Sequence, residues 1–599
     1  MMTIPRPEHP KPQFERTNWK NLNGEWDFEI DDGMSGEDRG LFKEDVKLSG
    51  KITVPFCPES SLSGVGHKEF MKAVWYQRKI EITAEELDGI VFLHFGAVDY
   101  RTRVYVNGVS AGSHKGGYVS FKLDITKYLR EGENTLTVLA KDDTRDPMIP
   151  RGKQSEKFYS VGCDYTRTTG IWQTVWLEFV PKTHVADFVF DAEPRTGLLL
   201  LKTELVGTGD FSADVFYEGR PVGSCALKNV KGTVLLPIQL SEIHLWEPGH
   251  GRLYDVIVKF GDDIVKTYYG LRSVQLEGYK FLINGKSVFQ RLILDQGFYP
   301  DGIYTAPTAE ALEHDIDMSM AMGFNGARLH EKIFEERFLY YCDKKGYLVW
   351  GEYPNWGLDH TRPEAIYSIL PEWVEELKRD RNHPAIIGWC PFNETWNKHD
   401  CRQHDDLLRQ IYRTTKAIDP YRPCIDTSGN YHVETDIFDV HDYNQDPVSW
   451  KKNYDSIMET GELYDRFKEM ENAGLATRYY HHYQNYAGEA TMVSEYGGIK
   501  WTKEQAEREK NREAGVELTN DRRTSWGYGK DVESAAEFKA RFKGLTDALL
   551  DNSCMFGLCY TQLTDVEQEQ NGLYTYERVA KFDPEWVRSV VSRKAAIED

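Results

Sequence analysis

The sequence has no long hydrophobic run and few cysteines. None of its 599 residues lies in a stretch approaching the roughly 20 consecutive apolar residues that a membrane-spanning helix needs, so no membrane partner is expected. The nine cysteines are scattered, without a CxxC pair, which argues against a disulfide framework or a zinc cluster. The segment MMTIPRPEHPKPQFER carries proline and charge where a secretory leader needs an apolar run, and we therefore expect a cytoplasmic protein.

Positive charge is scarce relative to negative charge. Asp and Glu number 95 against 73 Lys and Arg, and the formal net charge is −22. Because the acidic residues are spread along the whole chain, this charge opposes binding to nucleic acid and to anionic lipid. Aromatic residues are abundant, with 15 Trp and 34 Tyr. Flat apolar rings stack on sugar faces, although the core of an aromatic-rich β domain would account for them as well.

The length of the chain predicts several domains, because 599 residues exceed what one hydrophobic core supports. Up to Val180, segments such as VWYQRKIEI and YRTRVYVNG alternate apolar and polar residues, which predicts an antiparallel β-sandwich over residues 1–180. The dipeptide Asn107-Gly108 is a strong hairpin signal. The same alternation in LLLLKTELVG and RLYDVIVKF predicts a small immunoglobulin-like β-sandwich over residues 181–272.

After Gly270, candidate strands alternate with helical segments. Eight candidate strands lie at 289–295, 324–330, 346–352, 385–394, 422–428, 437–443, 491–498 and 555–562. The helix after the first of them would begin at the N-cap Thr308. Eight such units predict a (β/α)8 barrel over residues 273–599, although the connection between the fifth and sixth strands is too short for a helix. The segment 444–490 is long for a connection, so we expect it to contain a helix and to cover the site.

Two glutamates end strongly apolar candidate strands. Barrel enzymes place catalytic groups at the C-terminal ends of their strands, and Glu394 follows IIGWCPFN while Glu495 follows TMVS. A carboxylate at the mouth of a barrel core is costly to desolvate unless it has a task. The fourth and seventh strands lie on opposite sides of the mouth, so these carboxylates can face each other across one sugar. Either glutamate taken alone could equally be a capping or salt-bridged residue.

A facing pair of carboxylates is what glycosidic cleavage with retention requires, at a separation of about 5–5.5 Å. Two carboxylates so close raise one pKa, which keeps one group protonated near neutrality so that it can protonate the leaving oxygen. The neighbouring Asn393 could donate a hydrogen bond to the sugar 2-OH, an interaction that strengthens in the transition state.

Six longer motifs are distributed over essentially the whole chain, namely WKNLNGEWDFEI, DYTRTTGIWQTVWLE, GFNGARLH, CDKKGYLVWGE, RNHPAIIGWCPFNE and VSEYGG. Together they resemble glycoside hydrolase family 2, the β-galactosidase and β-glucuronidase family. The resemblance implies a jelly-roll sugar-binding domain, an immunoglobulin-like domain and a C-terminal (β/α)8 TIM barrel, in that order. It also implies a glycoside or oligosaccharide substrate and a homo-oligomer.

The resemblance assigns roles to individual residues. Glu394 matches the general acid/base and Glu495 matches the nucleophile. Tyr443 matches a tyrosine that hydrogen-bonds the nucleophile, though it could be an ordinary strand-end aromatic. Asp164 matches an aspartate that the jelly-roll domain sends into the sugar pocket, though it could be a plain turn acid.

Three further residues match positions around the pocket. Arg328 and His330 match its floor, where the alternative is a buried arginine–carboxylate pair near the nucleophile. Trp356 could be a platform on which the sugar stacks or simply a loop anchor.

Metal binding is not expected. The β-galactosidases of this family hold magnesium with the acid/base glutamate and with a glutamate and a histidine after the third strand, where this chain has Trp356 and Leu358. Neither residue supplies an oxygen ligand for a hard cation, so we predict no magnesium and no cofactor. A rival metal site lacks any HExxH spacing; its ligands would be His441, Asp442, His481 and His482. The histidines of RYYHHYQNY are expected to line the rim of the site or to pack the long connection.

These observations predict a retaining, exo-acting β-D-galactosidase. The alternatives are an α-L-arabinofuranosidase or β-D-galactofuranosidase and, less favoured, a β-glucuronidase. In the β-glucuronidases of this family an Asn-x-Lys motif binds the sugar carboxylate, and Glu569, Gln570 and Asn571 correspond to it here. Because the positive charge of that motif is gone, uronic acids are expected to be poor substrates. A catalytically inactive carbohydrate-binding protein is disfavoured, because both glutamates, Asn393 and Tyr443 are all present.

Overall fold

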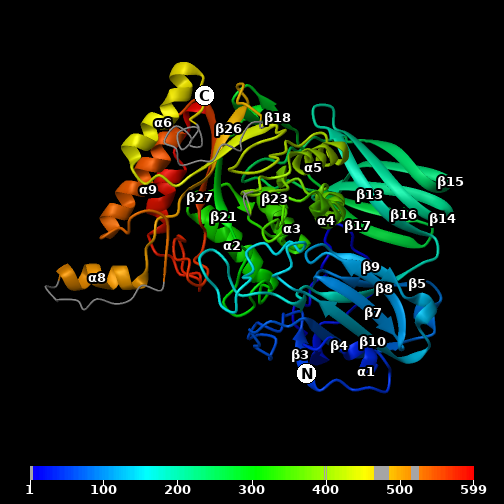
Figure 1. Ribbon diagram of the computed structural model, residues 1–599. Coiled ribbons are helices and arrows are strands. Elements are labelled where there is room, and N and C mark those ends of the chain that lie inside the picture. Colours follow the sequence, from blue (N-terminus) through cyan, green and yellow to red (C-terminus); the bar gives the residue numbers. More distant parts are fainter. Residues whose placement is uncertain (1–3, 397, 399–400, 465–483, 514–524, 599) are drawn as a thin grey trace.

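The computed structural model describes residues 4–396, 398, 401–464, 484–513 and 525–598. Two β-rich units, coloured blue to teal in Figure 1, lie beside a larger unit of strands and helices that occupies the rest of the chain. Among the described residues, no helix combines the length and apolar character needed to cross a membrane. The cellular location stays a prediction.

The N-terminal unit consists of two antiparallel sheets that share one core. One sheet has the order β1-β12-β5-β9 and the other β3-β2-β4-β10-β7-β8, and buried side chains from both, such as Val91 and Val138, belong to one hydrophobic cluster. The strands are β1 (Trp19–Asn21), β2 (Gly24–Ile30), β3 (Gly50–Val54), β4 (Ala73–Ile82), β5 (Ile90–Phe95), β7 (Arg101–Val106), β8 (Val109–Lys115), β9 (Phe121–Asp124), β10 (Gly132–Lys141) and β12 (Val175–Val180), with a small pair of β6 (Val98–Asp99) and β11 (Gly170–Ile171). The expected hairpin is confirmed, because Asn107 and Gly108 join β7 to β8 with φ of 51° and 77°.

The second unit is an antiparallel sheet in which β13 (His184–Glu193), β14 (Leu198–Tyr217), β16 (Tyr254–Phe260) and β17 (Asp263–Tyr269) follow one another and β15 (Arg220–Gln239) pairs with β14. The register of the long β14/β15 pair breaks between Leu205 and Gly209, and such irregularities let strands bend. All five strands contribute to one core. The chain passes between sheets at residues 181–183 and 270–273, and we propose 1–180, 181–272 and 273–599 as the domain limits.

The third unit contains a curled parallel sheet, consistent with a barrel. Its order within the described ranges is β24-β23-β22-β21-β27-β26-β25. The strands are β21 (Gln290–Asp295), β22 (Gly326–Leu329), β23 (Leu348–Glu352), β24 (Ile386–Cys390), β25 (Ile437–Asp442), β26 (Ala490–Gly497) and β27 (Met555–Thr561); a small sheet of β18 (Val274–Glu277), β19 (Lys280–Ile283) and β20 (Lys286–Ser287) precedes them. Phe281 of β19 packs against Phe556 at the start of β27.

One predicted barrel strand does not form as a regular strand. The segment 422–428 makes only isolated bridges, from Cys424 to Trp389 and from Ser428 to Asn393. The backbone N–H groups of Cys424 and Thr427 donate to the carboxylates of Asp436 and Asp426, and such side-chain bonds compete with a strand ladder. As expected, no helix separates this segment from β25, and the backbone N–H of residue 436 donates to Cys424 O, so the segment still bridges the two edges of the sheet.

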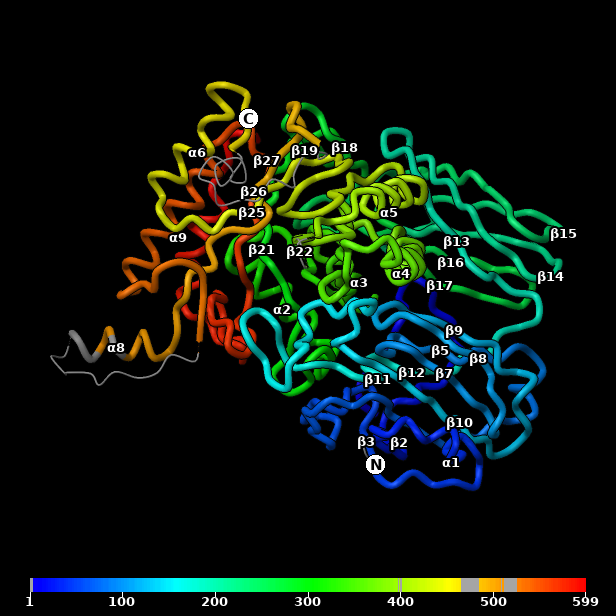
Figure 2. The backbone as a smooth tube through the Cα atoms, viewed as in Figure 1, coloured from blue at the N-terminus to red at the C-terminus, as the bar shows by residue number. Residues whose placement is uncertain are grey.

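Helices follow most of the barrel strands, as Figures 1 and 2 show. They are α2 (Ala309–Ala321), α3 (Glu336–Lys345), α4 (Ile366–Asp380), α5 (Asp405–Ile418), α6 (Pro447–Thr460), α8 (Lys503–Glu513), α9 (Ala535–Leu550) and α10 (Pro584–Val591); the short helices are α1 (Gly36–Arg39), η1 (Glu85–Leu87), η2 (Thr126–Tyr128), η3 (Pro363–Ala365) and η4 (Ala596–Glu598). The predicted N-cap is confirmed, since Thr308 Oγ1 accepts from the backbone N–H of Ala311 at 3.2 Å. The helix expected within 444–490 is α6, whereas His481 and His482 lie outside the described residues.

The N-terminal unit docks on the barrel through buried polar contacts. Glu372 of α4 accepts hydrogen bonds from the Tyr118 backbone N–H at 2.8 Å and from Tyr353 Oη at 3.0 Å. Burial raises the pKa of Glu372 to about 7, although Tyr118, His114 and Tyr353 favour the anion. A carboxylic acid at a domain interface therefore takes up a proton in the folded state near neutral pH.

This interface predicts a pH-dependent stability. Because the folded pKa of Glu372 lies above its unfolded value, its contribution to stability is fully present below about pH 4 and is lost as the pH rises through about 7. We expect the wild-type Tm to fall between pH 5 and pH 8, and Glu372→Gln to lessen the corresponding loss by up to ~3 kcal/mol. The control is Glu364→Gln, at an exposed carboxylate just before α4. The same pH profile of Tm for Glu372→Gln and wild type would contradict the argument.

Candidate active site

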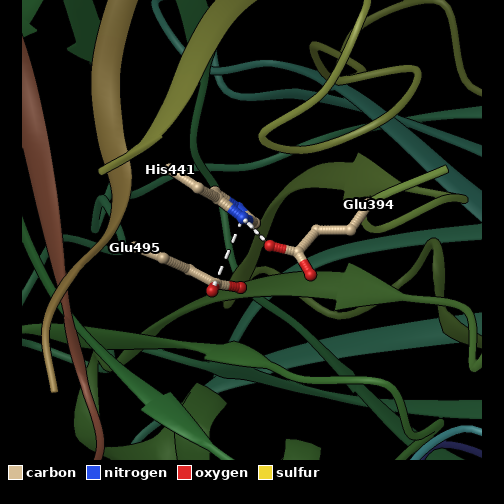
Figure 3. A group of neighbouring side chains, drawn as sticks. All are labelled: Glu394, His441 and Glu495. Carbon is tan, nitrogen blue, oxygen red and sulfur yellow. Dashed lines mark hydrogen bonds and ion pairs between the residues drawn. The ribbon is translucent and has the colours of Figure 1, made fainter. Parts of the chain in front are cut away.

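Two carboxylates and a histidine meet at the C-terminal ends of the parallel strands (Figure 3). His441 of β25 lies between Glu394, which follows β24, and Glu495 of β26; its Nδ1 is 2.8 Å from Glu394 Oε1 and 3.5 Å from Glu495 Oε2. One nitrogen or oxygen atom from each of the three side chains lies within 4.8 Å of the others. Glu495 is buried and Glu394 is half-buried. The strand ends thus bring together the two glutamates that the sequence singled out.

The carboxylate of Glu495 is held at both oxygens. Arg328 Nη1 donates to Oε1 at 3.2 Å, and Tyr443 Oη donates to Oε2 at 2.6 Å. The ring of Tyr443 stacks on Tyr528, with centroids 3.5 Å apart. These contacts leave the Glu495 carboxylate little freedom to rotate.

The pKa of Glu394 moves in the opposite direction to the expected one. Burial would raise it, but the hydrogen bond and charge of His441, together with the charge of Lys153, lower the pKa of Glu394 to about 2. His441 Nδ1 lies 2.8 Å from Glu394 Oε1, and because an ionised carboxylate only accepts hydrogen bonds, Nδ1 carries a proton and is the donor. The expectation that carboxylate repulsion would raise a pKa is therefore wrong for Glu394, because a donor lies between the two glutamates.

Sequence reasoning missed His441 as a partner of carboxylates. From the sequence, His441 is predicted only as a possible metal ligand, although its position at the end of a barrel strand points to the site. On its far side, Nε2 lies 2.9 Å from Ser428 Oγ, which donates to Asp439 Oδ2 at 2.5 Å. The irregular segment 422–428 therefore helps to orient the histidine.

Arg328 and His330 lie beneath the two glutamates. Arg328 is 1% exposed and donates through Nε to Glu352 Oε1 at 2.5 Å and through Nη2 to Asn393 Oδ1 at 3.0 Å. His330 Nδ1 lies 3.3 Å from Glu352 Oε2, and burial lowers the pKa of His330 well below its usual value. Arg328 forms a buried ion pair with Glu352 and also contacts Glu495, whereas the place of Arg328 and His330 on the floor of a sugar pocket stays a prediction.

Asn393 keeps one donor unused. Its Oδ1 accepts from Arg328 and its backbone N–H donates to Asn355 Oδ1 at 2.7 Å. Its Nδ2 is buried and has no hydrogen-bond partner among the residues that the structure describes. A buried donor without a partner is costly, which is consistent with a ligand contact at this atom.

Trp356 and Asp164 lie in loops, outside the helices and strands. Trp356 Nε1 donates to Asn393 O at 3.2 Å, and its backbone N–H donates to Glu331 Oε2 at 3.0 Å. Asp164 Oδ1 accepts from Arg151 Nη1 at 3.0 Å. Both residues therefore have anchoring contacts, and their part in binding a sugar stays a prediction.

The group of Glu394, His441 and Glu495 has the spacing of a possible metal site. Three features oppose this: Nδ1 of His441 carries a proton, both oxygens of Glu495 accept hydrogen bonds, and the cation Arg328 contacts Glu495 directly. Leu358, the position that would carry a magnesium ligand, is fully buried. Of the rival set, His441 lies at this site, Asp442 accepts a hydrogen bond from Tyr454 at 3.2 Å, and His481 and His482 lie outside the described residues.

We expect hydrolytic activity to survive dialysis against a chelator, because the site has a proton and a guanidinium where a metal would need free lone pairs. Initial rates before and after dialysis, each with and without added Mg²⁺, test this. A loss of rate that Mg²⁺ restores would contradict the absence of a metal at Glu394.

Comparison with known proteins places these residues in context. Residues 19–181 match the family description "Glycosyl hydrolases family 2, sugar binding domain", and residues 274–502 match "Glycosyl hydrolases family 2, TIM barrel domain". A β-galactosidase of Thermoanaerobacter pseudethanolicus is 30% identical over 362 residues, which are 57% of this chain and 47% of that protein. A β-glucuronidase of Felis catus is 26% identical over 540 residues, which are 80% of this chain and 77% of that protein.

The match therefore spans about half the length of the bacterial β-galactosidase. Among solved structures, a β-glucuronidase from Ruminococcus gnavus in complex with D-glucuronic acid has a TM-score of 0.76 at 18% identity, covering 98% of this chain and 100% of that one. At this identity the likeness shows a shared fold.

Proposed function

Since the chain belongs to glycoside hydrolase family 2, we propose that it is a retaining, exo-acting glycosidase with Glu495 as nucleophile and Glu394 as general acid/base. The observation that carries the proposal is the approach of the two side chains around His441, with polar atoms within 4.8 Å. Retaining glycosidases hold their carboxyl groups about 5–5.5 Å apart, whereas inverting ones leave about 6.5–9.5 Å for a water molecule. The spacing favours double displacement.

In the first step Glu495 attacks the anomeric carbon, the glycosidic bond breaks, and the leaving oxygen takes a proton from Glu394. In the second step Glu394 removes a proton from water, which attacks the same carbon and releases Glu495. Tyr443 and Arg328 orient the nucleophile through its two oxygens. We propose that Asn393 Nδ2, which has no hydrogen-bond partner among the described residues, donates a hydrogen bond to the sugar 2-OH. This hydrogen bond strengthens in the transition state.

Glu394 must acquire a proton before it can act as the acid, because its contacts hold its pKa at about 2. The hydrogen bond to His441 is the chief interaction that favours the anion, while burial favours the neutral acid. A substrate that draws the carboxyl group away from His441 toward the glycosidic oxygen removes the hydrogen bond that favours the anion. It also increases the burial that favours the neutral acid. We propose that substrate binding protonates Glu394 in this way.

We propose a β-D-galactoside as the substrate. The bacterial relative at 30% identity is a β-galactosidase, and Glu569 occupies the position where a uronide-binding motif has its asparagine. Glu569 is 2% exposed and accepts a hydrogen bond from Tyr165 Oη at 2.6 Å. Lys500, a cation that could replace the missing lysine of the motif, instead donates to Ser525 O at 2.8 Å. An α-L-arabinofuranoside and a β-D-galactofuranoside are the alternatives, because these sugars share configuration at several ring carbons. A homo-oligomeric state also stays a proposal.

A β-glucuronide is the second candidate, on a specific observation. The ammonium group of Lys153 lies over the ring of Trp356, so a cation stands near the site even though the Asn-x-Lys motif is missing. The mammalian relatives are named β-glucuronidases. Sequence reasoning missed this lysine, because it comes from the N-terminal unit and not from the barrel.

The substrate proposal predicts the order of kcat/KM on four 4-nitrophenyl glycosides at one pH and salt concentration. We expect the β-galactoside to exceed the β-glucuronide and the β-galacturonide, since like charges 4 Å apart cost about 4 kcal/mol at an effective dielectric of 20. The α-L-arabinofuranoside is the fourth substrate and tests the neutral alternative. A uronide that is the best of the four would refute the proposal of a neutral sugar.

A further inference from the structure

Lys153 is a buried cation without an ionic partner. It is 5% exposed, and across the described part of the chain its ammonium group makes neither a hydrogen bond nor an ion pair. Its Nζ lies 3.7 Å from the centre of the Trp356 ring, a cation–π contact that offsets part of the cost of leaving water. A buried charge that lacks hydrogen bonds is expensive to keep, so this lysine is a candidate for a ligand contact.

The loop that carries Lys153 is fixed to the barrel. The backbone N–H of Arg151 donates to Trp356 O at 2.7 Å, and that of Gly152 donates to Pro354 O at 3.2 Å. Gly152 has φ of 55°, and a Cβ there would lie 2.3 Å from Glu331 O, so the close approach requires glycine. The ammonium group is therefore held in place by the docking of two domains.

Trp356 links Lys153 to the chain beside Glu394. The indole beneath Lys153 donates to Asn393 O, next to Glu394 in the chain. Burial would lower the pKa of Lys153, but Cys163 and the charges of Glu569, Glu495 and Glu394 raise it above its usual value. The lysine thus stays charged beside three carboxylates, with none of which it forms an ion pair.

Glu569 is held back from Lys153 by its own contacts. Its Oε2 accepts from Tyr165 Oη at 2.6 Å and its Oε1 accepts from Asn571 Nδ2 at 3.0 Å. The charge of Lys153 lowers the pKa of Glu569 against the larger effect of burial, which raises it. Tyr165 also joins the two groups, because its backbone N–H donates to Lys153 O at 2.7 Å.

We propose that Lys153 and Glu569 together bind one hydroxyl group of the sugar. An ammonium group only donates hydrogen bonds and a carboxylate only accepts them, whereas a hydroxyl group does both. A uronide carboxylate in the same place would meet the negative charge of Glu569. The inference rests on the proposed glycosidase function and narrows its substrate class to neutral sugars with a hydroxyl group at that position.

The test combines one substitution in the protein with the removal of single hydroxyl groups from the substrate, so that the two losses in kcat/KM can be compared. Wild type and Lys153→Met are compared on the preferred aryl glycoside and on its four analogues that each lack one hydroxyl group. We expect Lys153→Met to lower kcat/KM on the parent glycoside by roughly tenfold to a hundredfold, the size of a hydrogen bond to a charged group. On one deoxy analogue the same variant should cause little further loss, because the contact is already missing.

Lys157→Met, at an exposed lysine of the same loop, is the control and should match wild type throughout. A Tm close to the wild-type value should accompany the loss in Lys153→Met. Equal losses on all five substrates, or no loss on the parent, would overturn the role of Lys153 while leaving the glycosidase function standing.

Glu569→Gln separates the two charges. We expect it to raise the ratio of uronide to neutral-sugar kcat/KM, because the repelling carboxylate is gone while the lysine stays. A wild-type preference for a uronide, lost selectively in Lys153→Met, would show that the lysine binds a carboxylate and would overturn the hydroxyl proposal. The glycoside panel tests the function, and the deoxy series tests Lys153, so the two failures remain distinct.

Discussion

The guanidinium group of Arg328 is the contact on which the arrangement of the site depends. It extends from β22 and contacts residues at the ends of β23, β24, β25 and β26. These partners are Glu352, Asn393, Ser494 O, Glu495 and His441. A planar group with five donors suits such a set of acceptors. Without it, the buried carboxylates of Glu352 and Glu495 would lose the guanidinium group that forms ion pairs with both.

The second constraint is that the barrel alone does not complete the site. A loop of the N-terminal unit delivers Lys153 to the ring of Trp356, and Tyr165 of the same unit binds Glu569 in the loop after β27. The buried acid Glu372 lies at this same junction of domains. In the proposed function, catalysis takes place at the strand ends, and the sugar is bound by residues of two domains that must dock correctly.

The sequence sufficed for those features that depend on local pattern or on topology. Glu394 and Glu495 could be predicted because each ends an apolar run, and parallel strands of a barrel bring their C-terminal ends together. The prediction of a regular strand at 422–428 is wrong because the carboxylates of Asp426 and Asp436 take up backbone donors of this segment that a strand would use. The position of His441 at a strand end points to the site, but its contacts with both glutamates, and the contact of Lys153 with Trp356, arise between residues far apart in the chain.

The central claim is that Glu495 forms a covalent bond with the sugar. The most direct measurement is the mass of the peptides from protein incubated with a 2-deoxy-2-fluoro glycosyl fluoride of the preferred sugar, in which fluoride leaves readily and the fluorine at C2 slows breakdown of the intermediate. The account predicts one fluorosugar per chain, attached to the peptide that contains Glu495 and released when an acceptor is added. A label attached to Glu394 or to any other carboxylate would contradict it.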